Sequence, residues 1–293
     1  MRFILLLSRL ELIFCACLLS SCISGKWSSK KACFRHSYAQ NVRPEFWLEY
    51  HPYPPKQPED LLPQVRAIPN YDGWTDLRME RDLKQISTAG FTTILLPVSP
   101  ETLAGKTFAE RLLRFHQIAA ALPRPLSLAL IVTPEAADFT LSLPNTLDFF
   151  LNHGLHNFPN SLKVKQRPIL FFANQVHLFG EYDGPCAYAK INDFFPDVDG
   201  LSMNKPCRVL VSKKPAASKT TPKNLERDIK DYRANGFFFA QQLQQAFEQQ
   251  ARIIYISSWN NYQDASFIQP NSLDQQQMLE ILQKARQALA SGE

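Results

Sequence analysis

The residues best suited to chemistry follow an apolar stretch near the C-terminal end of the sequence. Four apolar, mostly β-branched or aromatic residues, Ile253 to Ile256, run into Ser-Ser-Trp-Asn-Asn-Tyr-Gln-Asp. The apolar run predicts a buried parallel strand, and the polar and aromatic residues after it predict a loop at its carboxyl end. In α/β barrels and open α/β sheets, ligands bind at that end. The loop up to Pro270 is therefore the first candidate for a functional site.

This loop resembles the signature of the WbsX-like and endo-α-mannosidase-type glycoside hydrolases (family 99), which is roughly Trp/Phe-Asn-Glu-Trp-x-Glu-Gly-x-x-Ile/Leu-Glu-Pro. The positions that match, with one aromatic residue replacing another, are Trp259, Asn260, Tyr262, Ile268 and Pro270. The two catalytic glutamates of the family fall on Asn261 and Asp264. A third glutamate falls on Gln269. The resemblance implies a glycoside hydrolase-like barrel with a carbohydrate ligand and an altered set of catalytic residues.

In the resembled family, the first glutamate acts through the 2-hydroxyl of the sugar and the second is the general acid. The amide of Asn261 can hydrogen-bond to a hydroxyl but cannot take its proton. Asp264 keeps the acid function on a side chain one methylene shorter, and a displacement of about 1 Å can cost on the order of 100-fold in rate. Loss of a general base removes a further factor of roughly 10² to 10⁴.

Two other carboxylates follow predicted strands. Glycoside hydrolysis usually needs two carboxyl groups that flank the bond, and Glu49 or Glu135 could supply the second one; alternatively, an acetamido group of the substrate could act as the nucleophile. Each carboxylate also has a structural explanation. Glu49 is compatible with the edge of a strand, and Glu135 follows Pro134, where an acidic side chain at the start of a helix is favoured.

Binding of a glycan requires fewer intact residues than hydrolysis does. Aromatic rings can stack on sugar faces, and amides can pair with vicinal hydroxyls. The candidates for substrate binding are Trp259, Asn260, Tyr262, Gln269, His51, Tyr53 and Asn174. Alternatively, Trp259 is a core aromatic residue and the amides satisfy backbone groups of the loop. The aromatic and proline residues after the first strand could also simply close one end of a barrel.

The N-terminus predicts a targeting segment rather than part of the fold. Its apolar run is shorter than the ~20 residues of a comfortable spanning helix, and it ends in Leu19-Ser20-Ser21-Cys22, which resembles a bacterial lipobox. We expect a signal peptide over 1–21, a lipid (palmitate-type) anchor on Cys22, and a polar tether over 22–43. Because Ile23 is not aspartate, the pattern favours the outer membrane. An uncleaved anchor or an ordinary signal peptide are the alternatives.

Three cysteines remain after this segment, and they predict at most one disulfide. We expect a bridge between Cys186 and Cys207, which flank a strand-like segment, and a free thiol at Cys33. The histidines and cysteines are scattered without zinc-ligand spacing, so no metal is expected. No glycine-rich phosphate loop is present, and no cofactor is expected.

The remaining sequence alternates between predicted strands and helices. Strands are expected near 46, 91, 126, 168, 198, 208 and 253, and a helix over 76–89 ends at Gly90. This alternation predicts an α/β fold of one domain over 44–293, a (β/α)8 TIM-type barrel. The net charge of +5 is spread along the chain, which argues against a nucleic-acid binder.

Two functional hypotheses follow. The first is a lipid-anchored, diverged glycosidase that acts on envelope or host glycans with Asp264 as the acid. The second is a catalytically inactive lipoprotein of the bacterial cell envelope that binds a glycan or a protein partner. The amides at Asn261 and Gln269 favour the second hypothesis, whereas the carboxyl group of Asp264 favours the first.

Overall fold

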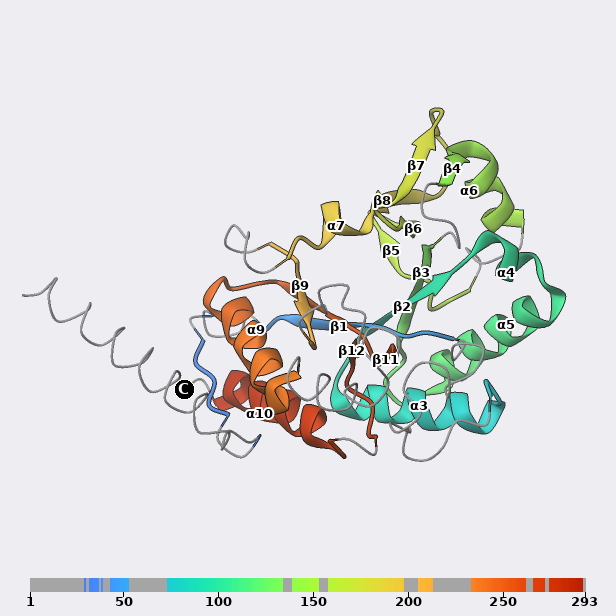
Figure 1. Cartoon of the computed structure of the whole chain (residues 1–293). Coiled ribbons are helices and arrows are strands. Elements are labelled where there is room, and N and C mark those ends of the chain that lie inside the picture. Colours follow the sequence, from blue (N-terminus) through green and yellow to red (C-terminus); the bar gives the residue numbers. More distant parts are fainter. Residues whose placement is uncertain are drawn as a thin grey trace, which may run out of the picture.

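A largely parallel β-sheet forms the centre of the structure (Figure 1). The computed structural model describes residues 29, 32–36, 38, 43–52, 73–133, 139–152, 158–197, 205–212, 233–261, 266–271 and 274–291. The strands of the main sheet are β1 (Glu45–Glu49), β2 (Thr93–Val98), β3 (Ser127–Val132), β5 (Lys163–Val164), β6 (Arg167–Phe172), β8 (Ala187–Lys190), β9 (Cys207–Leu210) and β10 (Ile253–Ser257). Their order is β5-β6-β3-β2-β1-β10-β9, with β8 also paired to β6. The short β5 alone is antiparallel to its neighbour.

Helices alternate with strands along much of the chain, as is typical of an α/β domain. They are α3 (Asp76–Ala89), α4 (Pro100–Ala104), α5 (Lys106–Ala121), α6 (Leu143–Asn152), α7 (Ile191–Phe194), the 3₁₀ turn η4 (Ala234–Gly236), α9 (Phe237–Glu248) and α10 (Gln277–Ser291). Along one side of the sheet, α9 contacts α10, α10 contacts α3, and α3 contacts α5 (Figure 1). Helices on this side bury the central strands, which explains why those strands are continuous apolar runs.

The helix over 76–89 and its end at Gly90 are confirmed. The Thr75 hydroxyl accepts a hydrogen bond from the backbone N–H of Arg78, which caps the start of α3. Gly90 has a φ of 88°, in the left-handed region that favours glycine. The guanidinium group of Arg286, from α10, lies against Gly90 and donates a hydrogen bond to the Ala89 carbonyl. Helix α10 thus supplies a hydrogen-bond donor to a carbonyl at the C-terminal end of α3.

This contact leads to a testable difference between two glycines. A Cβ atom at Gly90 would lie 1.8 Å from the Arg286 guanidinium, whereas one at Gly73, where φ is 82°, would meet nothing within 4 Å. We expect Gly73→Ala to lower the free energy of unfolding by about 1 kcal/mol, the cost of the left-handed backbone. Gly90→Ala should cost about 1–2 kcal/mol more, because Arg286 must leave the Ala89 carbonyl. Chemical denaturation of both variants measures the difference, and equal losses would contradict it.

The single α/β domain agrees with the prediction from the sequence, but the described strands do not form the predicted closed barrel. Within the described residues the sheet is open, with β9 at one end and β5 and β8 at the other. The strand expected over 198–203 lies outside the described residues. The sequence patterns also missed a small parallel sheet of β4 (Phe139–Ser142) and β7 (Val176–Phe179). These strands belong to the connections after β3 and β6, so their pairing depends on contacts across the fold.

Part of the expected tether packs against the domain. Phe34 and Tyr38 are buried, and both rings contact the ring of Phe247 in α9. The Tyr38 hydroxyl donates a 2.7 Å hydrogen bond to the Ala251 carbonyl, and the Ser29 hydroxyl donates one of 2.7 Å to Glu280. The packed domain therefore extends to at least Ser29. Among the described helices, none combines the length and apolar character needed to cross a membrane. Residues 1–21 and Cys22 lie outside the described residues.

The disulfide predicted between Cys186 and Cys207 is wrong. Both thiols are free, and Cys33 is also free and exposed. Cys186 immediately precedes β8, beside β6, whereas Cys207 begins β9 at the opposite end of the sheet order. A disulfide needs Cα atoms less than about 7 Å apart, and several strands separate these two. Burial raises the pKa of the Cys186 thiol to about 11 and that of the Cys207 thiol to about 12.

Candidate functional site

The carboxyl ends of β1 and β10 bring a buried glutamate together with three hydrogen-bond donors. Glu49, the last residue of β1, is only 8% exposed. Its Oε2 accepts a short hydrogen bond from the Tyr255 hydroxyl and one of 3.0 Å from Ser257 Oγ, both from β10. Its Oε1 accepts a 2.7 Å hydrogen bond from His51 Nε2. The register explains the cluster: Trp47 is the partner of Tyr255, and every second residue points to the same face of a sheet.

The electrostatic environment keeps Glu49 ionised. Burial by itself would raise its pKa, but the hydrogen bond and charge of His51, the charge of Arg208 and the Tyr255 hydroxyl together lower the pKa to about 2. Arg208 comes from β9 and donates a 3.0 Å hydrogen bond to Ser257 Oγ. Glu49 is therefore a fixed carboxylate at neutral pH. It cannot donate a proton as a general acid, and both of its oxygens are engaged.

His51 is the accessible member of this cluster. Its side chain is 27% exposed, compared with 10% for that of Glu49. An ionised carboxylate only accepts hydrogen bonds, so the His51 nitrogen facing it, Nε2, carries the proton. In the neutral ring, Nδ1 then has the lone pair, and it makes no hydrogen bond to the described residues. A histidine oriented by a carboxylate in this way has the geometry of a general base.

The asparagine at the start of the signature loop holds the cluster in place. The Asn260 side chain accepts a 2.8 Å hydrogen bond from the His51 backbone N–H and donates one of 2.9 Å to the His51 carbonyl. Asn260 and Asn261 form β11, which pairs with β12 (Ser266–Phe267) in a hairpin. Asn261 is partly exposed, and its N–H donates to Ser258 Oγ. Asn260 thus fixes the loop after β1 to this hairpin.

Three residues considered for substrate binding lie in the interior: Asn260, which is only 2% exposed, Trp259 and Gln269. Trp259 is 0% exposed, as expected for a core aromatic residue. The Gln269 amide is also buried and donates a 3.3 Å hydrogen bond to Asp82 of α3. Asp82 in turn accepts hydrogen bonds from Tyr50 and Arg78, and burial raises its pKa despite the charge of Arg78. These placements favour the structural alternative for these residues.

Asn174 lies away from this cluster, and the remaining predicted site residues lie outside the described residues. Asn174 is exposed after β6 and accepts a 3.2 Å hydrogen bond from the Asn192 N–H, and two strands separate β6 from β1 in the sheet. The lipidation residue Cys22, the binding residues Tyr53 and Tyr262, and the carboxylates Glu135 and Asp264 lie outside the described residues. The described part of the site therefore contains Glu49, His51, Asn260 and Asn261.

Arg233 is a contributor that the sequence analysis missed. This buried arginine follows the region over 213–232 and pairs with Asp274 at 2.5 Å. It also donates a 2.9 Å hydrogen bond to the Phe267 carbonyl, and its guanidinium lies 4.2 Å from the centre of the Phe267 ring. These contacts fix β12, the returning strand of the hairpin. No local pattern marks Arg233, because its partners are 34 and 41 positions away in the sequence.

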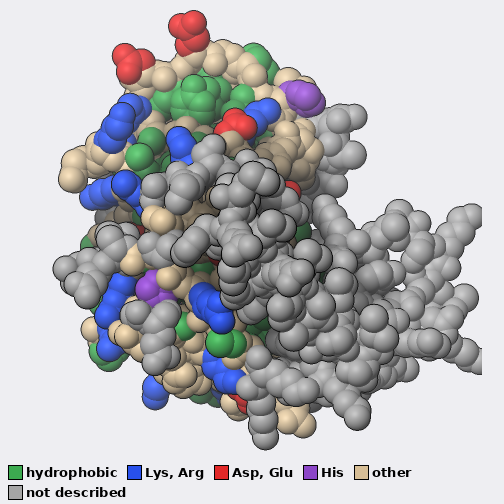
Figure 2. All heavy atoms as spheres, turned by 90° about the vertical axis from the view of Figure 1, so that its left-hand side faces the viewer, with side chains coloured by type: hydrophobic (Ala, Val, Ile, Leu, Met, Phe, Trp, Pro, Cys, Tyr) green, Lys and Arg blue, Asp and Glu red, His purple; other side chains and the backbone are tan. Residues whose placement is uncertain are grey.

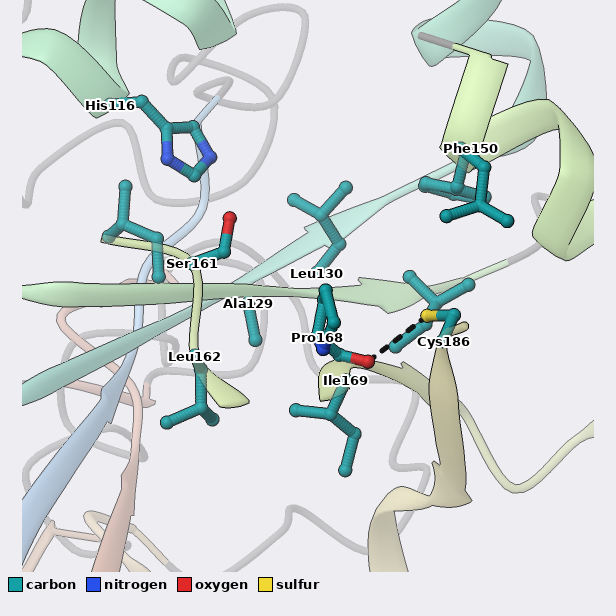
Figure 3. Close-up of a pocket in the computed structure, with 12 residues that line it drawn as sticks. His116, Ala129, Leu130, Phe150, Ser161, Leu162, Pro168, Ile169 and Cys186 are labelled. Carbon is teal, nitrogen blue, oxygen red and sulfur yellow. Dashed lines mark hydrogen bonds between the residues drawn. The ribbon is translucent and has the colours of Figure 1, made fainter. Parts of the chain in front are cut away.

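A separate small cavity lies between β3, β6 and α6, away from this cluster (Figure 3). Its volume is about 40 Å³. The labelled lining includes the apolar residues Leu130 and Ile169, together with His116. Burial lowers the pKa of His116 to about 4, so the ring is neutral as it stacks on Phe158. Within the described residues, no group of three His, Cys, Asp or Glu side chains could hold a metal ion. The lining also includes the Cys186 thiol, whose pKa is raised by burial to about 11, so the cavity is a small packing space without an ionised thiol.

Comparisons with known proteins identify a shared fold. No family model matches the sequence, and no curated protein matches it. Two solved structures of the GH99 endo-α-mannosidase from Bacteroides thetaiotaomicron, one of them in complex with BIS-TRIS-propane, are similar to this chain. Each has a TM-score of 0.54 and covers 85% of this chain and 100% of the mannosidase chain, at 12% and 11% sequence identity. The chain is thus a single mixed α/β domain with a parallel sheet, similar in fold to the GH99 TIM-barrel enzymes.

Proposed function

We propose that this chain is a diverged, glycosidase-like protein that acts on carbohydrate at the carboxyl ends of β1 and β10. The observation that carries the proposal is the Glu49–His51 pair, which lies at 2.7 Å beside the signature hairpin. The GH99-like fold supports a carbohydrate ligand at this end of the sheet, where barrel enzymes have their active sites. The proposal assigns to His51 the proton-accepting role that the amide of Asn261 cannot perform.

In this reaction His51 and Asp264 have complementary tasks. The Nδ1 atom of His51 takes a proton from a sugar hydroxyl or from the attacking water, while Glu49 stabilises the imidazolium that forms. Asp264 gives a proton to the leaving glycosidic oxygen. Water supplies the hydroxyl group that ends on the anomeric carbon, so bond breaking and proton transfer balance. Asn261 then hydrogen-bonds a sugar hydroxyl rather than acting as a base.

The proposed site of action is the bacterial cell envelope. A lipid on Cys22 would attach the chain to a membrane, and Ile23 after the cysteine favours the outer membrane. Each buried methylene of an acyl chain contributes ~0.8 kcal/mol, so several acyl chains give stable attachment. The substrates would then be glycans of the envelope or of a host. Mass spectrometry of the purified N-terminal peptide tests the anchor, and an unmodified Cys22 would contradict it.

Release of reducing ends from a panel of α-mannans and envelope glycans tests the activity. We expect His51→Ala and Asp264→Asn each to lower the rate by roughly 10² to 10⁴, because each removes a proton-transfer group. His177→Ala is the matched control, because His177 is an exposed histidine on β7. Release by the wild type that survives in His51→Ala would overturn the role of His51.

A non-catalytic glycan-binding or protein-binding lipoprotein is the second candidate. The observation that favours it is the amide at Asn261, together with the fixed carboxylate of Glu49, whose two oxygens are both hydrogen-bonded. This alternative predicts no release from any glycan, but binding that depends on His51 and Asn261 in a glycan array. Activity gained by Asn261→Glu alone would indicate a binding groove that has lost its base.

A further inference from the structure

The end of the sheet opposite to the candidate site is rich in exposed cations. In a parallel sheet, the residues just before each strand lie at the same end of the domain. The exposed lysines and arginines at these positions are Arg43 before β1, Arg124 before β3, Lys165 and Arg167 at the start of β6, Lys205 before β9, and Arg252 before β10. At the start of β2, the half-buried Arg286 lies against Gly90. These seven residues define the amino-end face.

Fewer carboxylates than cations lie at this end. By the same topology, the exposed carboxylates of the described residues near this end are Glu45, Glu181, Asp183, Asp197 and Glu248. None of the seven cations makes an ion pair within the described part of the chain. Figure 2 shows the side from which β1 begins, with lysine and arginine side chains spread over much of its described surface and acidic side chains mostly near its upper edge.

Compensation of helix dipoles does not explain this arrangement. Helices α3, α5, α9 and α10 end at this face, and cations can stabilise helix C-termini. That effect falls off beyond the last turn, and the last turns of all four helices contain no basic residue. Two of the seven cations are accounted for by hydrogen bonds to backbone carbonyls: Arg286 donates to Ala89, and Arg167 donates to Gly184 and Cys186. Burial lowers the pKa of Arg286, and the nearby charge of Arg124 lowers it further.

We propose that the amino-end face binds an anionic lipid surface. The cations are spread across six strands that lie about 4.8 Å apart, so they form a broad face rather than a pocket for a compact ligand. Clusters of lysine and arginine are attracted to anionic phospholipid headgroups within about a Debye length. Binding in this orientation turns the carboxyl ends of β1 and β10 away from the membrane. This inference goes beyond the proposed function and does not depend on a lipid at Cys22.

Vesicle co-sedimentation of the full chain carrying Cys22→Ser tests this proposal without a lipid anchor. Vesicles of phosphatidylcholine alone are compared with vesicles containing phosphatidylglycerol. We expect binding to the anionic vesicles to be stronger and to weaken as salt rises to about 0.5 M. The double variant Arg124→Glu/Arg252→Glu should bind at least about tenfold more weakly to the anionic vesicles.

The matched control reverses two cations away from this face. Lys106 begins α5 and Lys190 ends β8, both near the carboxyl ends of strands, so Lys106→Glu/Lys190→Glu changes the net charge by the same amount. We expect this variant to bind like the Cys22→Ser chain. Equal weakening by both double variants would overturn the proposal, because it would reflect net charge alone. Binding to soluble polyphosphate without preference for anionic vesicles would also overturn it and would indicate a soluble polyanion as the partner.

Discussion

The Glu49→Gln variant should unfold at a temperature about 6–12 °C lower than the wild type. The substitution keeps the shape of the side chain but leaves His51 and Arg208 without the carboxylate that they face. Breaking a buried charge pair by removing one partner costs about 3 kcal/mol or more. In a domain of this size, 1 kcal/mol changes Tm by about 2–4 °C. Thermal unfolding followed by circular dichroism measures the effect.

The dependence of this difference on pH follows from the ionisation of Glu49. Its pKa is lowered from 4.5 to about 2, so its ionised form stabilises the folded state. This stabilisation is fully present above pH 4.5 and is lost as the pH falls toward about 2. The difference between the wild type and Glu49→Gln should therefore shrink over this range.

Glu45→Gln is the control for this prediction, because Glu45 lies on the same strand but is exposed. A glutamine at position 45 can still accept the hydrogen bond from Trp47 Nε1. We expect almost no change in Tm for this control. If the two variants had equal Tm values at pH 7, the buried network around Glu49 would not contribute to stability.

Arg233→Ala should destabilise the domain by about 3–5 kcal/mol. The side chains of the Arg233–Asp274 pair are 2% and 9% exposed, so the substitution leaves a buried carboxylate without its partner. It also removes the hydrogen bond to the Phe267 carbonyl and the guanidinium above the Phe267 ring. Because these contacts fix β12, the hairpin beside His51 should lose order as well. Urea denaturation measures the stability, and hydrogen exchange at Phe267 and Ile268 reports on the hairpin.

The exposed pair between Arg111 and Asp76, a carboxylate that Arg114 also contacts at 2.8 Å, provides a control at the same N–O distance. Its N–O distance is also 2.5 Å, but the side chains are 39% and 43% exposed. Solvent screens such a pair, so Arg111→Ala should change the stability only slightly. A double-mutant cycle of Arg233→Ala with Asp274→Ala separates the pairwise contribution from the loss of packing. A small or zero coupling in that cycle would contradict the role of the buried pair.

The sequence predicted the elements that depend on neighbouring residues. The apolar run at 253–256 predicted β10, and the pattern over 76–89 with Gly90 predicted α3 with its bounds. Both signals are local, since strand burial follows continuous apolar runs and a left-handed glycine ends a helix.

Only the tertiary structure decided which side chains of these elements meet. Glu49 lies 206 positions before Tyr255, and neither residue carries a local signal of the other. Trp259 and Asn260 matched a family signature, yet they are buried, whereas His51 is partly exposed. Cys186 and Cys207 flank one segment of sequence but lie toward opposite ends of the sheet. Sequence separation does not determine strand order, because the order follows from which apolar faces bury one another.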